Sequence, residues 1–395
     1  MIMVSLVHIK NLFVIIPFLL LTIVKPNEAT NVLDFGARAD GRTDSTLAFQ
    51  RAWVSACGSG SPVILDIPYG RFVLRPITFS GPCRNVIKLR IQGTIVGPSN
   101  YRVLAQSNVW ITFHRVNGLT IDGGTLNAGG KSFWSCRRLY GNCYNGAQSI
   151  SFVSCNNVVV RGLTSLNSQK SHMSIKNCNN IALNYLTLRA PSGSPNTDGI
   201  NIQHSNRILI FGSVIKTGDD CIAIGPGTKN TIVNRIHCGP GHGISIGSLA
   251  NTLEEDGVEN IIVANIVFWR STNGVRIKSW ARPSNGYVRN VIFRNIMMFY
   301  VDYPILIDQT YCPHNICPRQ NSGIKISNVR YSNIRGTSRR KEAMQFTCSP
   351  SNPCTGITLQ DIRLTHATNL NEPAVSTCSY ARGTTRGIVI PGSCF

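Results

Sequence analysis

A short phrase recurs along most of the chain. In each copy an Asn is followed by apolar and β-branched residues that alternate with polar ones, and then by a polar turn. Alternation with a period of two is typical of strands that bury one face. Successive copies begin 23 to 40 residues apart, at Asn117, Asn157, Asn180, Asn206, Asn230, Asn260, Asn290 and Asn328.

A repeat of this size cannot bury its apolar face alone, so the copies have to stack on one another. Short strands at about one coil per 25 residues predict an all-β fold, a right-handed parallel β-helix or solenoid. The leading Asn of each coil is expected to form an internal ladder that bonds to the coils on either side. A β-sandwich also has many short strands, but it does not repeat one phrase with the same leading residue.

Helical patterns are scarce. The one good candidate is a short N-terminal helix from Ser45 to Ala56, with Ser45 or Asp44 as the N-cap. Such a helix would cap the open end of the stack. No Pro- or Ser-rich linker and no low-complexity tract divides the rest of the chain. We therefore expect a single β-helix domain over residues 30–395.

The first 29 residues have the shape of a secretory signal peptide. Lys10 precedes an apolar run from Leu12 to Val24, which is too short for a membrane span and is interrupted by Pro17. We place the cleavage near Ala29, although no small-x-small site marks it. The alternative is a buried N-terminal strand. Export would place the mature protein outside the cell, with no membrane segment left.

The 14 cysteines of an exported chain indicate disulfides rather than metal ligands. No CxxC-type cluster with His supports a zinc site. Cys155 and Cys178 each begin a similar phrase and are expected to be stacked, buried thiols, although their pairing, like that of Cys57 and Cys83, stays open. Five local pairs are expected: Cys136/Cys143, Cys221/Cys238, Cys312/Cys317, Cys348/Cys354 and Cys378/Cys394.

The chain is strongly basic, with a formal net charge of +21. This excess favours an acidic partner, either a nucleic acid or an acidic polysaccharide. No zinc finger, helix-turn-helix pattern or basic amphipathic helix is present, and export argues against nuclear partners. We therefore expect an acidic polysaccharide and no nucleic acid, and we expect the protein to be a monomer.

Carboxylates are nearly excluded from the middle of the chain. Between residues 122 and 254 the acidic residues are Asp198, Asp219 and Asp220. Asp198 lies 21 and 22 residues before the pair, close to one coil, and His242 lies 22 residues beyond Asp220. Equivalent positions of stacked coils are about 4.8 Å apart, so these side chains are expected to meet in one groove.

Two cations are expected to join this groove, because Arg276 and Lys278 alternate along one strand and so share a face. Each motif has a simpler interpretation: GDDC as a solvated turn, HG between glycines as a turn, and RIK as an ordinary basic strand. Their regular spacing at the coil period favours a common catalytic site instead.

The motifs NTDG, GDDC, GHG and RIK, in this order, resemble the four signature motifs of the polygalacturonase family of glycoside hydrolases. The phrases GDDCIAIGPGT and CGPGHGISIGS are similar to its plant branch, and the resemblance runs from Asn31 to the closing PGSCF. It implies a right-handed parallel β-helix that hydrolyses α-1,4 links of polygalacturonic acid, the backbone of pectin, in the cell wall. It implies no cofactor and no metal.

The resemblance also implies a role for each matching residue. Asp219 corresponds to the acid that protonates the leaving glycosidic oxygen. Asp198 and Asp220 correspond to the carboxylates that activate water, with inversion of configuration. His242 corresponds to a residue that supports the protonation state of the acid.

Substrate binding is implied for four further positions. Arg276 and Lys278 match cations that grip a uronate carboxylate, and Asn196 and Tyr311 match polar contacts with the sugar. From these cations we expect a basic groove, in which salt weakens binding of the polyanion. The chain departs from the family at Asn201, where His is frequent, and also at Ala250 and Pro313, which leaves subsite preference in doubt.

The mode of attack stays open, with endo hydrolysis slightly favoured over exo. The loops at Gly129 to Asn145 and Tyr311 to Gln320 are the candidate walls that could block the groove. A pectate lyase shares the predicted fold but uses calcium and an Arg base. A catalytically inactive pectin-binding wall protein is the alternative from another class.

Overall fold

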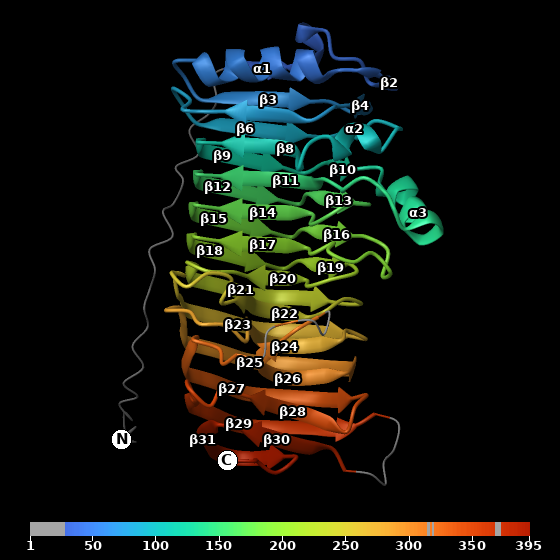
Figure 1. Cartoon of the computed structure of the whole chain (residues 1–395). Helices are drawn as coiled ribbons and strands as arrows, with labels where there is room; N and C mark the ends of the chain where they lie inside the picture. Colours follow the sequence, from blue (N-terminus) through green and yellow to red (C-terminus); the bar gives the residue numbers. More distant parts are fainter. Residues whose placement is uncertain (1–27, 314–316, 318–319, 368–372) are drawn as a thin grey trace, which may run out of the picture.

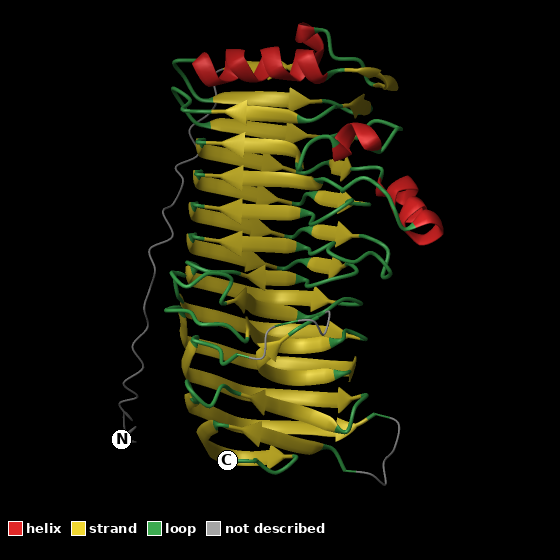
Figure 2. Ribbon diagram, in the orientation of Figure 1, coloured by secondary structure: helices red, strands yellow, loops and turns green. Residues whose placement is uncertain are grey.

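The repeated phrases form the coils of a right-handed parallel β-helix (Figure 1). The computed structural model describes residues 28–313, 317, 320–367 and 373–395. The expected signal peptide therefore lies almost wholly outside the described residues. Among these residues, helices lie at the N-terminal end and on one side of the stack (Figure 2).

Each coil contributes to two parallel sheets, here called sheet A and sheet B. In the early coils a strand of sheet B is followed by one longer and one three-residue strand of sheet A. From β21 onward these two sheet A strands fuse into one long strand. Sheet B comprises β5 (Ile77–Ser80), β8 (Val109–His114), β11 (Gln148–Val153), β14 (Met173–Lys176), β17 (Ile200–Gln203), β20 (Ile222–Ile224), β22 (Ile244–Leu249), β24 (Asn273–Trp280), β26 (Tyr303–Tyr311), β28 (Glu342–Thr347) and β30 (Val375–Ser379).

Sheet A comprises β1 (Glu28–Asn31), β2 (Asp40–Asp44), β3 (Val63–Ile67), β4 (Arg71–Val73), β6 (Ile87–Ile91), β7 (Thr94–Val96), β9 (Asn117–Asp122), β10 (Thr125–Asn127), β12 (Asn156–Arg161), β13 (Thr164–Leu166), β15 (Asn179–Asn184), β16 (Thr187–Arg189), β18 (Asn206–Phe211), β19 (Val214–Lys216), β21 (Lys229–Cys238), β23 (Val258–Trp269), β25 (Tyr287–Val301), β27 (Lys325–Ser338), β29 (Cys354–His366) and β31 (Ala381–Ile390). Every pairing between named strands is parallel and joins a coil to the next one. The predicted all-β solenoid is confirmed.

The core is a set of columns in which like side chains stack on like. Val158, Ile181 and Ile208 pair in register on β12, β15 and β18, and each is at most 2 % exposed. Burying such a side chain contributes roughly 1.5–3 kcal/mol, so one alternating strand per coil fixes the stack through apolar burial. Phe113 and Phe152 stack in the same way near the N-terminal end, with ring centroids 5.4 Å apart.

The expected Asn ladder is present, but it lies at the exposed starts of sheet A strands rather than inside the coils. Asn157 donates to Asn117 Oδ1 at 2.9 Å, and Asn180 donates to Asn157 Oδ1 at 2.7 Å. Asn157 and Asn180 have φ of +53° and +60°, a conformation that Asn tolerates better than most residues. A second ladder joins Asn234, Asn265, Asn295 and Asn333.

The N-terminal cap is helix α1 (Thr46–Gly58), close to the predicted range. Ser45 occupies the N-cap position, but its side chain makes no capping bond; Asp44 Oδ1 instead accepts from the Thr46 backbone N–H at 2.9 Å. Phe49 and Trp53 are about 1 % exposed and cover the end of the stack. The 3₁₀ helix η1 (Val32–Phe35) precedes it.

Two further helices were not predicted: α2 (Arg102–Ala105) and α3 (Gly130–Tyr140). Helix α3 belongs to the loop that we expected to be a groove wall. It projects from the side of the stack in Figure 1. Trp134 fixes its base, since Trp134 is 6 % exposed and its Nε1 donates to the Ser168 carbonyl at 2.9 Å.

All five expected disulfides are present, and Cys57–Cys83 is a sixth. Cys155 and Cys178 are free and buried, as predicted. Disulfides are typical of proteins that fold in oxidising compartments. In the described part of the chain, no helix has both the length and the apolar character that crossing a membrane would require.

Candidate active site

Three of the predicted site residues occupy one position on successive coils. Asp198, Asp220 and His242 each lie two residues before a strand of sheet B, namely β17, β20 and β22. The first residues of these strands pair in register, so the three side chains start from neighbouring points along the stack. The spacing of 22 residues thus reflects one turn of the solenoid.

The glycines of the motifs allow the turns before these strands to pack closely. A Cβ on Gly218 would lie 2.4 Å from the Ser194 carbonyl oxygen of the preceding coil. Gly241 has φ of +148°, and a Cβ there would lie 2.6 Å from the Asp219 carbonyl oxygen. Any side chain at these two positions would therefore push the carboxylate-bearing turns apart.

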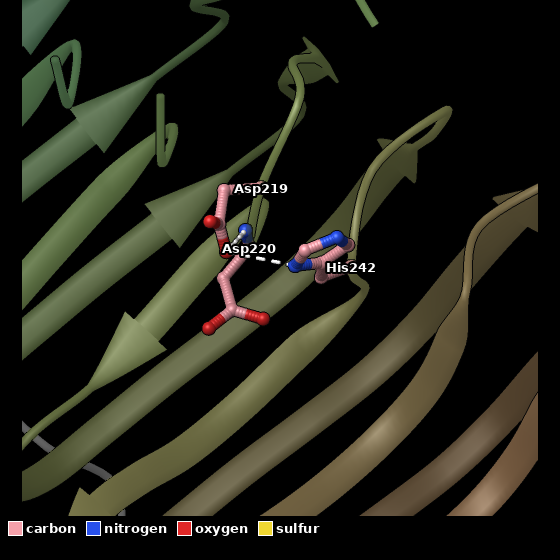
Figure 3. A group of neighbouring side chains, drawn as sticks. All are labelled: Asp219, Asp220 and His242. Atoms are coloured by element: carbon pink, nitrogen blue, oxygen red, sulfur yellow. Dashed lines mark hydrogen bonds and ion pairs between the residues drawn. The ribbon is translucent and has the colours of Figure 1, made fainter. Parts of the chain in front are cut away.

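Asp219 is surrounded by hydrogen-bond donors. His242 Nδ1 lies 2.9 Å from Asp219 Oδ1, as Figure 3 shows. The backbone N–H groups of Asn196 and Asp220 donate to Oδ2 and Oδ1 at 3.0 and 2.8 Å. Burial by itself favours the neutral acid, but these bonds and the His242 charge outweigh it and hold the pKa of Asp219 below its ordinary value.

Asp198 has the opposite tendency. Burial raises its pKa to about 8, and the nearby charges of Asp220 and Asp219 add to the effect. The Asn201 side chain and Lys278 oppose the shift but do not cancel it. In the substrate-free protein the neutral carboxyl of the cluster is therefore Asp198, whereas the sequence analysis assigned the protonated role to Asp219.

Asp220 is held by both predicted cations. Arg276 Nη2 donates to Oδ1 and Lys278 Nζ donates to Oδ2, each at 2.8 Å. Ser245 Oγ donates to Oδ1 at 2.8 Å and accepts from Arg276 Nε at 2.9 Å. Asp220, Arg276 and Lys278 are 2, 8 and 6 % exposed. The two cations thus share a face, as expected, but in this state they neutralise a catalytic carboxylate.

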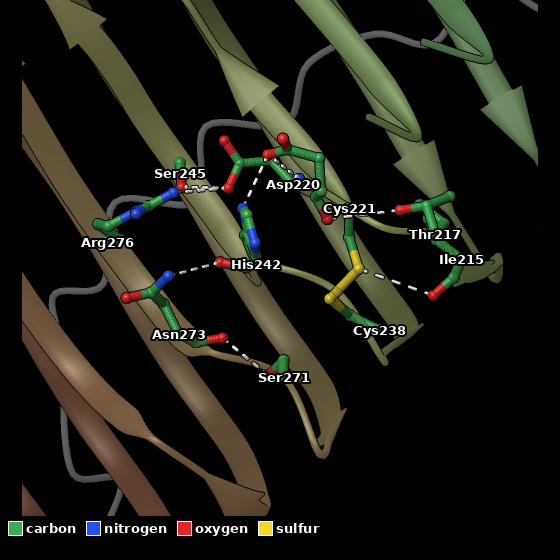
Figure 4. The surroundings of a disulfide bond; sticks show 11 residues. Ile215, Thr217, Asp220, Cys221, Cys238, His242, Ser245, Ser271, Asn273 and Arg276 are labelled. Atoms are coloured by element: carbon green, nitrogen blue, oxygen red, sulfur yellow. Dashed lines mark hydrogen bonds and ion pairs between the residues drawn. A yellow bond between two sulfur atoms is a disulfide. The ribbon is translucent and has the colours of Figure 1, made fainter. Parts of the chain in front are cut away.

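Ser245 is a site residue that the sequence analysis missed. It lies in the GHGISIGS run, and in sheet B it pairs in register with Arg276. The sequence signal was its place between Ile244 and Ile246, since alternation turns a residue between two buried apolar ones away from the core; its pairing with Arg276 is visible only in the structure. The Cys221–Cys238 disulfide lies next to Asp220 and joins the residue before β20 to the end of β21, the strand that follows it (Figure 4).

The other two predicted binding residues also face the groove. Asn196 has φ of +61° and lines the groove beside Asp219. Tyr311, at the end of β26, presents its ring to Lys278, whose Nζ lies 5.1 Å from the ring centroid. Cation–π attraction at such a distance helps to fix the Lys278 ammonium.

The groove has a volume of about 810 Å³, and its charge differs from our expectation. The described lining carries six carboxylic side chains, and its basic side chains are Lys278 and His204. The expectation of a basic groove was wrong, since the sequence analysis did not place the acidic run after β22 in this cavity. The carboxylic side chains are Asp198, Asp219, Asp220, Glu254, Glu255 and Asp256.

Asp219, Asp220 and His242 have donor atoms within 4.8 Å of one another, a spacing that a metal ion could bridge. Both oxygens of Asp220 already bind cationic side chains. Asp219 Oδ1 and His242 Nδ1 are engaged with each other. A metal ion would also be repelled by Arg276 and Lys278. The donor set therefore does not fit a metal, and no step of the reaction is assigned to one.

Comparisons with known proteins agree on the family. The profile of Glycosyl hydrolases family 28 matches residues 57–386. A polygalacturonase of Prunus persica is 49 % identical over 367 residues, which is 92 % of this chain and 93 % of the relative. An exopolygalacturonase of Arabidopsis thaliana (clone GBGA483) is 38 % identical, covering 94 % of this chain and 84 % of the relative. The crystal structure of a hyperthermoactive exopolygalacturonase from Thermotoga maritima is similar in fold, with a TM-score of 0.77, 20 % identity and coverage of 94 and 93 %.

Proposed function

The chain belongs to glycosyl hydrolases family 28, and we propose that it hydrolyses internal α-1,4-galacturonosidic links of polygalacturonic acid with inversion of configuration. Its relatives are polygalacturonases, so hydrolysis of pectin is the activity of the family. The observation that carries the proposal is one groove in which Asp198, Asp219, Asp220 and His242 meet beside Lys278.

Protonation of the leaving oxygen is assigned to Asp219, with His242 as its partner. In the resting protein the proton of the cluster is on Asp198, which is the reverse of what hydrolysis requires. Bound substrate would exclude water from Asp219 and disfavour its charged form. We therefore propose that substrate binding moves the proton from Asp198 to Asp219. Asp219 can then act as the acid, and Asp198 becomes a carboxylate.

Water activation is assigned to Asp198 and Asp220. The water oxygen bonds to the anomeric carbon as the glycosidic C–O bond breaks, and the water proton goes to this pair of carboxylates. Asp220 is a poor nucleophile because three donors already engage its two oxygens. This arrangement supports direct attack by water, and hence inversion, over a covalent intermediate.

The carboxyl spacing by itself does not argue for inversion. Inverting enzymes usually hold their two carboxyl groups ~6.5–9.5 Å apart. Asp219 and Asp220 have oxygen atoms within 4.8 Å of each other. We propose that Asp198 and Asp220 place the water together, while Asp219, on the same turn as Asp220, faces the leaving oxygen.

Uronate recognition is assigned to Lys278, with Arg276, Tyr311 and Asn196 around it. An ammonium has three donors, and the bond to Asp220 uses one of them. The remaining donors of Lys278 are available to a substrate carboxylate in the groove. Arg276 uses Nε and Nη2 on Ser245 and Asp220, which leaves Nη1 as a donor.

Endo attack is proposed because the described lining of the groove includes no residue of α3, one of the two expected walls. The second wall, between Tyr311 and Gln320, lies partly outside the described residues. Exo attack is the second candidate, since relatives named as exopolygalacturonases share the family. A time course of product sizes distinguishes them: mixed oligomers with a fast loss of viscosity support endo attack, whereas monomer alone from the first minutes would overturn it.

The same assay tests the chemistry. Hydrolysis releases reducing ends without the ultraviolet absorbance of unsaturated uronates and continues in a calcium chelator. A lyase would give the opposite result on both counts. A protein that bound polygalacturonate but released no reducing ends would be an inactive wall-binding protein. NMR of the first product would show the β-anomer for inversion and the α-anomer for retention.

We further propose that residues 30–395 are the mature domain, secreted into the cell wall as a monomer. Six disulfides and the relationship to plant polygalacturonases support an extracellular site of action. N-terminal sequencing of the exported protein would test the cleavage near Ala29, and gel filtration would test the oligomeric state.

A further inference from the structure

The groove does not account for the basic charge of this protein. Its described lining holds more carboxylic side chains than cations, although the chain has a net charge of +21. Much of the positive charge therefore lies on other surfaces. One of these surfaces is the outward side of the last strands of sheet A.

Five exposed arginines share this surface, here called the arginine face: Arg294, Arg330, Arg335, Arg363 and Arg386. They lie on four consecutive strands, β25, β27, β29 and β31. Their neighbours in sequence, such as Val329 and Tyr331, are buried, so the arginines point outward.

Strand register places the arginines close together. Arg335 and Arg363 pair directly, and Arg386 pairs with Gln360, which accepts from Arg330 Nη2 at 2.5 Å. Neighbouring strands are about 4.8 Å apart. In earlier coils the column that contains Arg330 is occupied by apolar residues, Ile262 and Ile292, and beyond Arg330 it continues with Thr358. The change to arginine is therefore local to the C-terminal coils.

These arginines lack acidic partners, unlike several basic residues of sheet A. Arg90 pairs with Asp66, Arg161 with Asp122 and Arg289 with Glu259. Among the described residues, none of the five has an ion pair. Like charges that face each other across strands are destabilising. The charges of Arg335 and Arg363 therefore repel each other in the free protein, and an acidic ligand would offset this repulsion.

We propose that the arginine face binds an acidic polysaccharide, as a second site apart from the groove on sheet B. Guanidinium groups match the planar geometry of carboxylates and stay charged at any relevant pH. No aromatic ring pairs in register with the arginines, although exposed Phe299 lies on the same strand as Arg294, so the expected export is what favours a polysaccharide over a nucleic acid. A long uronate chain could thus be held on sheet A while the groove acts on sheet B.

The test uses Arg335→Gln/Arg363→Gln, which removes two charges from the centre of the face. Arg51→Gln/Arg75→Gln is the matched control, since it removes two exposed charges from the N-terminal end. Both pairs are placed in an Asp219→Asn background, which keeps the polymer intact. Retention on immobilised polygalacturonate is measured with saturating trigalacturonate, which fills the groove.

We expect the central pair to weaken this residual retention about tenfold and the control pair to leave it unchanged. Residual retention should also be absent on fully methyl-esterified pectin. Equal loss in both pairs, no loss in either, or no residual retention before mutation would overturn the proposal. In protein that retains Asp219, the rate of hydrolysis of short oligomers should be the same with either pair of substitutions. That assay reports on the groove alone, so a failure of the proposed hydrolytic function would be seen separately.

Discussion

His242 Nδ1 lies 2.9 Å from Asp219 Oδ1, in the turn of the adjacent coil. This contact joins two residues 23 positions apart and is the main influence that lowers the pKa of Asp219 against the effect of burial. The acid of the proposed reaction is thus ionised at rest, and the reaction depends on how the cluster redistributes one proton. Coupled carboxyl groups of this kind titrate as a unit.

Asp219→Asn should abolish hydrolysis while leaving the fold intact, because the amide has nearly the size of the carboxyl and cannot donate its proton. The loss should exceed the ~10²–10⁴-fold that acid–base groups usually contribute, since the cluster acts as a unit. Release of reducing ends measures it, with circular dichroism as the check on folding. Asp66→Asn, on the outer face of sheet A, is the control. Activity near that of the control would refute the role assigned to Asp219.

The solenoid and the position of its catalytic residues could be predicted because both follow from one period. Asp198, Asp220 and His242 recur every 22 residues, and stacking places such residues together whatever their individual contacts. The repeat with alternating apolar residues likewise determines the core columns. These features depend on spacing alone, which a sequence displays directly.

Other features depend on side-chain reach and loop closure, which spacing does not show. RIK indicated a shared face, but not that Arg276 and Lys278 would both bind Asp220. Helix α3 was missed because it is short and has few apolar positions, of which Phe133 and Trp134 are buried. The run from Glu254 to Asp256 resembled a solvated turn, and only the path of the loop after β22 brings it into the groove.

Asp198 predicts a pH-dependent change in stability. Its folded pKa of about 8 lies above the unfolded value, so the folded state binds the extra proton between about pH 4 and pH 8. Stability from this group is complete below pH 4 and is lost as pH rises toward 8. The Asn of Asp198→Asn does not titrate, so the variant does not lose this stability as pH rises. It should melt at a higher temperature than the parent at pH 8 and at a similar temperature at pH 4. We expect a gain of order 1–3 kcal/mol at pH 8.

Thermal melting at both pH values, followed by circular dichroism, measures this difference. Asp122→Asn serves as a control, since burial is outweighed there by Arg161 and Lys88 and the pKa of Asp122 is lowered. That variant should lose stability at neutral pH rather than gain it. A gain for Asp198→Asn that was the same at pH 4 and pH 8 would contradict the raised pKa of Asp198.

Lys278→Ala should impair both binding and stability. It removes the proposed donor to the substrate carboxylate, which raises KM for polygalacturonate more than for a methyl-esterified polymer. It also leaves Asp220 with one cation instead of two in a buried setting, and breaking such a pair costs roughly 3–5 kcal/mol. Lys278→Arg keeps the charge and should retain the fold. A change in KM of the Lys278→Arg variant would therefore report on substrate binding without the loss of stability. If Lys278→Ala raised KM equally on both polymers, this would argue against recognition of the uronate by Lys278.

The acidic wall of the groove should limit binding of fully charged polymer. Glu254, Glu255 and Asp256 line the cavity, and burial raises the pKa of Glu255, which reduces but does not remove the negative charge of the wall near neutral pH. Replacing the three by Gln, Gln and Asn should lower KM for de-esterified polygalacturonate severalfold, because repulsion of uronate carboxylates is relieved. The fold should survive, since the one ion pair lost, between His204 and Asp256, is largely exposed and such pairs contribute ~0–1 kcal/mol.

The comparison that decides this prediction is KM on polymers of low and high methyl-esterification. The parent should favour partial esterification more than the triple variant does, since an ester removes the charge that the wall repels. Added salt offers a second measurement, because screening should lower KM of the parent on charged polymer and have less effect on the variant. A triple variant whose KM rose on the de-esterified polymer would show that these carboxylic groups bind the substrate instead of repelling it.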